Sequence, residues 1–348
     1  MKNYLSKIYN KMKANIMGTG SAGNTNNSPV EDSLKQNGLY SRIVKTRKTD
    51  EQWKVKSKFK SDFTGGTKFS GSVISLLSLI SLLFLTVSCD KESELTAPVN
   101  DFVNIPDNQF ESILVEQNID SDGVINQKIS QTDALGVTHL DLTLSASNMY
   151  IEELTGIEGF TNLTYLSASG HLIEDIDLSH NTLLDTVLLQ ANELYSIYGL
   201  SKLNNLKKLD LSWNLLDSLS FKSESIEIVL AGNNLLEFFE VENAGKLKGI
   251  ILTGNKLSSI NLAKYSILET LMLSDNQIET IDLGQNNNLS HLYISGNILS
   301  ELSVSSNPNL VDLRVDRNPG LTCIQINIDQ EIPTVSLSEY QELSTNCN

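Results

Sequence analysis

The sequence predicts an α/β-type repeat solenoid, in which short coils of chain stack along one axis. The first observation is a repeated segment: the apolar positions and the Asn of residues 268–281 recur 21 residues later in residues 289–302. The second is the pattern inside each copy, L-x-x-L-x-L-x-x-N-x-L, whose alternating leucines are typical of a short strand with one side facing a core. Self-similarity at such a period is the signature of stacked supersecondary units.

The Asn of the pattern is predicted to be structural. It falls on Asn192, Asn214, Asn233, Asn255, Asn276, Asn297 and Asn318. An amide has two donor hydrogens and an acceptor oxygen, so stacked copies can satisfy backbone groups that would cost about 1–3 kcal/mol each if buried unpaired. A second register, with Asn234 in the pattern and Ile226 leading, is also compatible with the coil around Asn233. One coil before Asn192 the place belongs to His171, which we interpret as a structural histidine.

Residues 137–324 resemble a leucine-rich repeat domain of about nine coils. The motif above carries the resemblance, and a second apolar pair in each coil, such as Ile281 with Leu283, is similar to the short-period repeats of surface lipoproteins from Bacteroidetes-type bacteria. The resemblance implies a horseshoe with a parallel β-sheet on its concave face and an extended or turn-like convex side. Coils of this length leave little room for a long helix.

Residues 105–136 are expected to form an N-terminal cap that begins with a short helix. Asp107 or Asn108 can cap this helix, with Glu111 reaching back as in a capping box. The apolar side chains of the segment then share one helical face and would cover the open end of the first coil.

The cap also contains a segment that resembles a calcium-binding loop, N-I-D-S-D-G-V-I-N, with Asp120 and Asp122 at its third and fifth positions. The twelfth position of such a loop carries a bidentate Glu, and here it is Ile129. We therefore expect a turn at this place, with no metal site, and keep Asp120 and Asp122 as the candidate ligands of a weak calcium site.

Residues 1–68 are predicted to be a basic, mostly disordered leader. Residues 1–70 contain 14 Lys+Arg against 5 Asp+Glu, whereas residues 90–348 contain 12 against 37, a net charge of −25. The letters G-T-G-S-A-G at residues 18–23 match a dinucleotide fingerprint but lack the strand and helix that it requires, so we expect a flexible loop. We interpret the basic run at residues 54–60 as the flank of a membrane segment. A nucleic-acid contact is the less favoured alternative.

Residues 69–89 form an uncharged apolar segment that is long enough to span a bilayer. Its end, L-T-V-S-C-D, resembles a lipoprotein signal, which implies cleavage before Cys89 and lipidation of that thiol. Thr86 departs from the aliphatic residue usual in this motif, and an uncleaved signal anchor is the alternative. Residues 90–104 would then be a tether. Its acidic start resembles the tract associated with transfer to the outer leaflet, which predicts a surface-exposed outer membrane lipoprotein of the cell envelope.

Residues 325–348 are expected to cap the C-terminal end. Cys323 and Cys347 bracket this region, and an exported cap can hold a disulfide that ties the tail across the end of the sheet. Two free, buried thiols are the alternative.

The concave face is predicted to carry the binding site, because side chains between the core leucines alternate to that face. We expect an exposed apolar strip there, flanked by small hydroxyl residues, and such patches usually mark a partner site. The alternative is that open strand positions simply favour β-branched and aromatic residues. The residues expected to contact a partner are Leu188, Trp213, Val229, Ile251, Met272, Tyr293 and Arg314.

These features favour a non-catalytic binding protein. The four histidines lie in different coils, and the sequence contains no G-x-S-x-G, H-E-x-x-H or C-x-x-C motif, so we expect neither catalytic residues nor a cofactor. The partner is expected to be a protein or a glycan held on the concave face. A structural adhesin is the alternative function. The net charge of −25 disfavours nucleic acid and anionic lipid as ligands.

Overall fold

The computed structural model describes residues 101–143 and 149–347. The predicted leader (1–68), the apolar segment with Cys89 (69–89) and the tether up to residue 100 lie outside the described residues. The described residues belong to one compact unit of the chain. None of its helices combines the length and apolar character needed to cross a bilayer.

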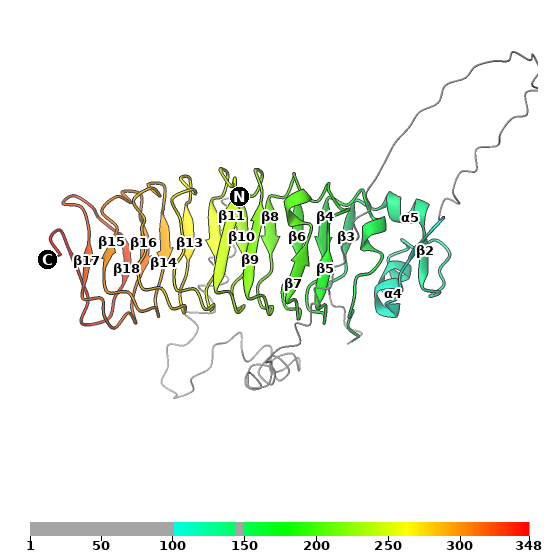
Figure 1. Ribbon diagram of the computed structural model, residues 1–348, viewed down its shortest axis with the longest axis horizontal. Helices are drawn as coiled ribbons and strands as arrows, with labels where there is room; N and C mark the ends of the chain where they lie inside the picture. The colour runs from blue at the N-terminus through cyan, green and yellow to red at the C-terminus, as the bar shows by residue number, and fades with distance from the viewer. Residues whose placement is uncertain (1–100, 144–148, 348) are drawn as a thin grey trace, which may run out of the picture. The chain divides into compact units, whose positions relative to one another are not determined.

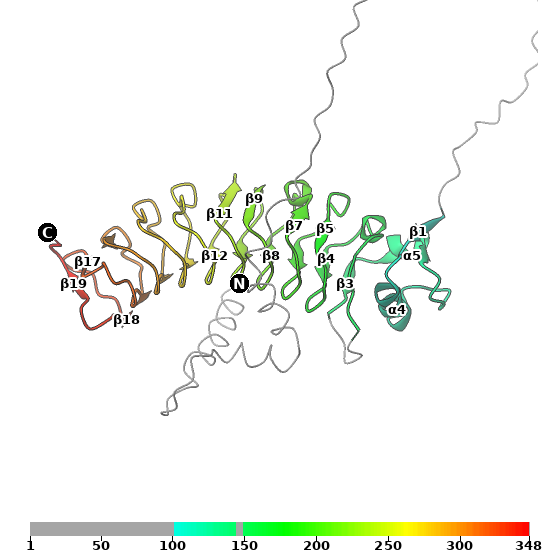
Figure 2. The ribbon, with the colours of Figure 1, turned by 60° about the horizontal axis from the view of Figure 1, so that its bottom comes forward.

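The unit is a parallel-sheet solenoid of the leucine-rich repeat type, with about nine turns and little helix, as the sequence predicted. Ten three-residue strands, one from each coil, form a single parallel sheet on the inner side of the curve (Figures 1 and 2). In chain order they are β3 (His139–Asp141), β4 (Tyr165–Ser167), β6 (Thr186–Leu188), β8 (Lys208–Asp210), β10 (Ile228–Leu230), β12 (Gly249–Ile251), β13 (Thr270–Met272), β14 (His291–Tyr293), β16 (Asp312–Arg314) and β18 (Thr334–Ser336).

The outer, convex side consists of shorter sheets and turns (Figure 2). Two 3₁₀ helices, η1 (Ile157–Gly159) and η2 (Leu200–Lys202), interrupt it. The convex strands are β5 (Asp175–Asp177) with β7 (Ser196–Tyr198), β9 (Ser218–Lys222) with β11 (Phe238–Glu242), and β15 (Leu302–Ser303) with β17 (Cys323–Gln325) and β19 (Glu342–Ser344), all paired in parallel.

The N-terminal end is closed by a cap of two strands and two helices. Strands β1 (Phe102–Asn104) and β2 (Lys128–Ser130) pair antiparallel, and helices α4 (Asn108–Glu116) and α5 (Gln131–Gly136) lie beside them. Asp107 is the N-cap of α4, and its carboxylate accepts hydrogen bonds from the backbone N–H groups of Gln109 and Phe110. The apolar face of α4 is buried, as predicted: Phe110 0%, Ile113 4% and Leu114 0% exposed.

The expected capping box is wrong. Glu111 is fully buried, and its carboxylate accepts hydrogen bonds from the backbone N–H groups of Asn126, Gln127 and Lys128, at 2.8, 2.8 and 3.1 Å. Glu111 therefore holds the loop that returns to β2, because this loop offers three orphaned donors together whereas the helix start is already capped by Asp107.

The core is a continuous column of aliphatic side chains that runs from the cap to the last coils. Each fully buried leucine contributes on the order of 1.5–3 kcal/mol by leaving water. Because each coil covers only its two neighbours, stability accumulates along the axis as in other solenoids.

The predicted Asn positions form a ladder of amides along one corner of the solenoid. Asn276 is representative: its amide donates to the backbone oxygens of Leu252 and Leu273, both at 3.0 Å, and its oxygen accepts from the N–H of Leu257 at 3.0 Å. Each amide thus ties its own coil to the preceding coil at two points. The same bonds recur at Asn192, Asn214, Asn255, Asn297 and Asn318.

Asn233 is not a member of this ladder. Asn234 takes the place: it is 2% exposed, donates to Leu211 and Ala231, and accepts from the N–H of Leu216. The register that starts on Ile226 is the one adopted, because it buries Ile226, whereas the other register would have put Ser225 at the first apolar position.

His171 occupies the ladder position of an early coil and is fully buried. Its Nδ1 accepts a hydrogen bond from the N–H of Ile151, and its Nε2 bonds the backbone oxygen of Leu142. Burial lowers the pKa of the imidazole, so the ring is neutral in the folded protein.

A second row of buried amides, which the sequence analysis missed, lies at another corner of the coils. The side-chain amides of Asn181, Asn286 and Asn307 each donate to two backbone oxygens of the preceding coil. The signal was present, since each of these residues follows a core residue by three positions, as Asn286 follows Leu283. In one coil Tyr265 replaces the amide, and its hydroxyl accepts a hydrogen bond from the N–H of Val241 at 2.9 Å.

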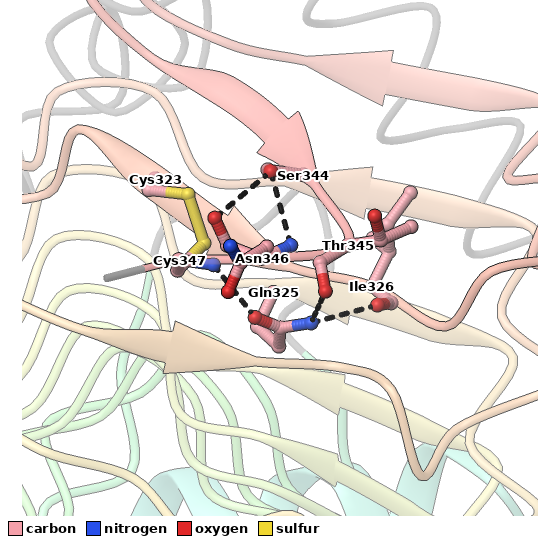
Figure 3. Close-up of a disulfide and its surroundings, with 7 residues drawn as sticks. All are labelled: Cys323, Gln325, Ile326, Ser344, Thr345, Asn346 and Cys347. Carbon is pink, nitrogen blue, oxygen red and sulfur yellow. Dashed lines mark hydrogen bonds between the residues drawn. A yellow bond between two sulfur atoms is a disulfide. The ribbon is translucent and has the colours of Figure 1, made fainter.

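The C-terminal residues continue the winding. Strand β18 extends the concave sheet, β19 extends a convex one, and Gln341 donates to the oxygen of Val315 as a ladder asparagine would. Cys323 and Cys347 form a disulfide, 24 residues apart in sequence (Figure 3). Gln325 holds the tail beside it, because its side chain accepts from the N–H of Cys347 and donates to the oxygen of Thr345.

Candidate functional site

The concave sheet arranges its side chains in columns, since paired residues of neighbouring parallel strands lie side by side. Residue Leu271 of β13, for example, is opposite Ile250 and Leu292, and all three face the core. The residue that follows each of them faces the concave side. This central column consists of Asp141, Ser167, Leu188, Asp210, Leu230, Ile251, Met272, Tyr293, Arg314 and Ser336.

Val229 does not belong to this column. It pairs with Leu209 and Ile250, is fully buried and faces the core, while Leu230 pairs with Asp210 and Ile251. The error has the same origin as that at Asn233, because a one-residue change of register moves a strand residue to the opposite face. The concave apolar side chains are therefore Leu230, Ile251, Met272 and Tyr293, which we call the apolar seam.

The apolar seam is less accessible than expected. Ile251, Met272 and Tyr293 are 3%, 6% and 7% exposed, so the predicted exposed strip is wrong in this respect. Side chains of neighbouring strands stand about 4.8 Å apart and cover one another. Tyr293 is also covered by the guanidinium of Arg314, 4.3 Å from the ring centroid, and its hydroxyl donates to Asp312 at 2.7 Å. The seam is thus a closely packed apolar floor.

Polar and aromatic groups lie on both sides of the seam. Toward the N-terminus the rings of His139 and Tyr165 are stacked with their centroids 4.0 Å apart, and Leu188 is half-buried. Burial raises the pKa of the Asp210 carboxyl in the central column. The face therefore changes along its length from acidic and aromatic groups to apolar ones and then to the Tyr293 and Arg314 pair.

One edge of the concave face is formed by the residues that directly precede the ladder positions, which we call the rim. Every rim residue has a positive φ, between 56° and 84°, because the chain turns out of the strand at this point. They are Gly170, Ala191, Trp213, Asn233, Gly254, Asp275, Gly296 and Arg317. Left-handed backbone is favourable for Gly and tolerated by Asn and Asp, and it is costly for other residues.

The C-terminal part of the rim is a network of charges. The guanidinium of Arg317 donates to Asp275 at 2.7 Å, passing Gly296, where an added Cβ would lie 2.8 Å from it. It also donates to Asp316, whose other oxygen accepts from Ser295 and Ser336. Burial raises the pKa of Asp316, but these hydrogen bonds prevail and hold it below its usual range.

Trp213 is the other large side chain on the rim. It has a φ of 61°, an unusual conformation for a bulky residue, and is half-buried. Its backbone N–H donates to the oxygen of Gly232, and its indole N–H makes no hydrogen bond with any described residue. The structure thus places Trp213 at the edge of the predicted binding face, beside the seam and not within it.

The calcium-like loop in the cap lies apart from the concave columns. Both carboxylate oxygens of Asp122 are used, because they accept from the N–H of Val124 and the amide of Asn126. Asp120 is 4% exposed with one unpartnered oxygen, and burial together with the nearby Asp122 raises its pKa. Among the described residues no group of three or more His, Cys, Asp or Glu side chains could hold a metal ion.

No protein-family model matches the chain, and no curated protein matches it. Among solved structures, the functional domain of InlJ from Listeria monocytogenes is similar at 19% identity and a TM-score of 0.47, over 68% of this chain and 61% of that one. Internalin C2 from the same species has the same identity and TM-score, over 69% and 99% of the two chains. The Toll–Spätzle complex of Drosophila includes a chain similar at 21% identity and a TM-score of 0.42, over 53% of this chain and 30% of that one.

Proposed function

We propose that this protein is a non-catalytic leucine-rich repeat binding protein that holds a protein ligand on its concave face. The observation that carries the proposal is the single ten-stranded parallel sheet, which presents one uninterrupted row of side chains. At about 4.8 Å per strand the row extends over roughly 40 Å. A rigid scaffold of this length needs no rearrangement to contact a folded partner.

The chemistry along the face supports a protein ligand. The centre is an apolar floor, and charged or aromatic groups stand at both ends, such as Asp210 on one side and Arg314 on the other. An apolar centre with a polar surround is the usual anatomy of a protein–protein interface. The net charge of −25 over residues 90–348 works against nucleic acid and anionic lipid as ligands.

A catalytic function is not supported by the histidines, the residues most often used for acid–base chemistry. His171 is buried in the ladder with both ring nitrogens engaged, and His139 is stacked on Tyr165. His180 and His291 belong to separate coils, the former at a convex turn and the latter in β14.

We further propose that the domain is held at the outer surface of the cell by lipid on Cys89. The support is the sequence alone: the apolar segment 69–89, its basic flank and the L-T-V-S-C-D end. The expected tether, residues 90–104, is too long at its C-terminal end, because Phe102–Asn104 form strand β1 of the cap. The rim and concave face start beyond residue 137, so a tether that ends before β1 would leave them free to meet a partner. An uncleaved signal anchor with a structural or adhesive role is the second candidate.

Replacing Ile251 and Met272 together by Lys tests the binding face. Both side chains point to the concave side and not into the core, and although their neighbours leave them only 3% and 6% exposed, the longer lysine side chains can extend past the floor to reach solvent, so the fold should persist. We expect capture of protein ligands, from extracellular matrix or from the envelope of the same cell, to fall at least tenfold, while the melting temperature stays within a few degrees.

The matched control replaces Tyr198 and Phe238 by Lys, since both are aromatic, lie on convex strands and are 56% and 51% exposed. Capture by this control should equal that of the unmodified protein. Equal capture by the concave variant, or an equal loss by both variants, would contradict the proposed site.

The intact mass of the membrane-extracted protein tests the anchor. A mature chain that begins at acylated Cys89 would support the lipoprotein, whereas a mass that includes residues 69–88 would support the signal anchor. A Cys89→Ser variant should then accumulate as the uncleaved precursor, and normal processing of this variant would contradict lipidation.

A further inference from the structure

We propose that Trp213, with the side-chain amides of Gln190 and Asn233, binds a neutral oligosaccharide on the rim of the concave face. The site lies beside the apolar seam and is independent of the protein ligand proposed above. Three features of the structure carry the inference: the backbone at Trp213, the lack of charge around it, and the hydrogen-bonding groups beside it that have no partner.

Trp213 is a bulky residue held in the left-handed region by the turn that all rim residues share. Arg317, also a large residue with a positive φ on the rim, is accounted for by its ion pairs with Asp275 and Asp316. Trp213 has neither an ion pair nor a side-chain hydrogen bond within the described part of the chain. Residues held in sparsely populated conformations concentrate at binding sites, where the strain positions a side chain for a ligand.

The strip on which Trp213 lies is uncharged, and the nearest carboxyl on the concave face, Asp210 of the central column, borders it and accepts from the N–H of Ser212. Across the five coils from Gly170 to Gly254, the rim and the concave column next to it contain only Gly, Ala, Ser, Thr, Gln and Asn besides Trp213. Residues 90–348 carry 37 acidic and 12 basic residues, so a neutral strip of this extent contrasts with the rest of the domain. A charged ligand would find no opposite charge on the strip to compensate its desolvation. An uncharged ligand needs no such compensation.

Hydrogen-bonding groups without a partner among the described residues lie along this strip. The side-chain oxygen of Gln190 is buried and has no partner among the described residues. The amide of Asn233 leans over Gly254, where an added Cβ would lie 2.7 Å from its oxygen, and the indole N–H of Trp213 is a further donor. Sugar hydroxyls, which donate and accept equally, suit a mixture of amides and an indole.

The geometry fits a short stretch of sugar chain. Ala191, Trp213 and Asn233 follow one another on the rim at the coil spacing of about 4.8 Å, so the three positions span about 10 Å. The small residues Gly170 and Ala191 leave room beside the indole, whose flat apolar face can stack on the C–H face of a sugar ring while its N–H reaches a hydroxyl.

The experiment measures binding of cellohexaose, laminarihexaose and mannohexaose to the full-length chain by calorimetry, with hexagalacturonate as the charged comparison. We expect at least one neutral hexasaccharide to bind and hexagalacturonate not to bind. With Trp53→Phe as background, Trp213 is the single tryptophan of the chain, and its emission should shift on titration with the same sugar.

The variant Trp213→Asn should weaken sugar binding at least tenfold, and Gln190→Leu should weaken it severalfold. Because Asn tolerates a positive φ, Trp213→Asn should keep or raise the melting temperature. Arg317→Asn, on the same rim but outside the neutral strip, is the matched control and should bind the sugar normally. The Ile251→Lys, Met272→Lys variant should also bind it normally, which separates this site from the protein site.

Three results would overturn the proposal: binding of none of the neutral sugars, unchanged affinity in Trp213→Asn, or equal binding of hexagalacturonate. A fall of several degrees in the melting temperature of Trp213→Asn would assign the indole to packing and would equally overturn it.

Discussion

At the scale of single residues, Asn233 and Asn234 show how far two identical neighbours can differ. Asn234 is buried and makes four hydrogen bonds to backbone groups of its own coil and the preceding one. The side chain of Asn233 lies on the rim and makes none with the described residues. The amide alone does not distinguish them. The difference comes from the bend of the chain, which turns one side chain into the solenoid and the other out of it.

We predict that Asn234→Ala destabilises the protein by about 1–3 kcal/mol, because it leaves the N–H of Leu216 buried without its acceptor. The oxygens of Leu211 and Ala231 keep the amides of Asn214 and Asn255 as donors. Asn233→Gly is the matched control and should be neutral or slightly stabilising, since Gly accepts the positive φ without strain. Chemical denaturation measures the free energy of unfolding of both variants. Similar losses in the two variants would contradict the register described here.

His171 predicts a pH dependence of stability. Burial lowers its folded-state pKa below the ordinary value of 6.5 for histidine, so on acidification the unfolded chain takes up the proton first. Stability from this residue is therefore complete above pH of about 6.5 and decreases as the pH falls below it. His171→Asn, which restores the residue of the other coils, should reduce this decrease in urea titrations between pH 5 and 7. If the variant has the same pH profile of stability as the unmodified protein, His171 is not the source of the pH dependence.

At the scale of elements, the two ends of the solenoid are closed differently. Helix α4 covers the first coil with Phe110 and Leu114, and the buried Glu111 fastens the loop behind it. No helix among the described residues covers the last coil. Its apolar residues Ile332, Leu337 and Leu343 are only partly buried, and the Cys323–Cys347 disulfide joins the tail to the preceding coil.

We therefore predict that Cys323→Ser with Cys347→Ser destabilises the last coil first. A disulfide that closes a loop of 24 residues contributes about 3 kcal/mol by the chain-entropy estimate. Hydrogen exchange should show loss of protection in β17 and β19 while β6 and β8 keep theirs. Uniform loss of protection along the whole domain would show that the array unfolds as one unit and that the effect is not local.

At the scale of the whole molecule, the function proposed here follows from repetition. Ten strands of equal length fix the positions of the central column and of the rim, and the residues at these positions vary more than those that face the core. The same scaffold can therefore carry an apolar seam at β10 to β14, a charged network around Arg317 and a neutral strip around Trp213.

The sequence by itself determined the solenoid, the parallel sheet, the capping helix and most of the amide ladder. These features depend on a periodic pattern of leucine and asparagine. Such a pattern can be recognised even when a single coil departs from it. In the coil around Asn234 the sequence allowed two registers, and the one that put Asn233 and Val229 in the pattern proved wrong, because only burial of Ile226 against its neighbouring coils chooses between them.

Tertiary structure alone decided which side chains on the concave face are accessible, what Glu111 binds and that the rim has left-handed backbone. Each of these depends on groups from different coils that meet in space, as Arg314 meets Tyr293 and Arg317 meets Asp275. A pattern along one chain specifies which residues alternate inward. The distances across coils, and hence the surfaces offered to a partner, arise only when the coils have stacked.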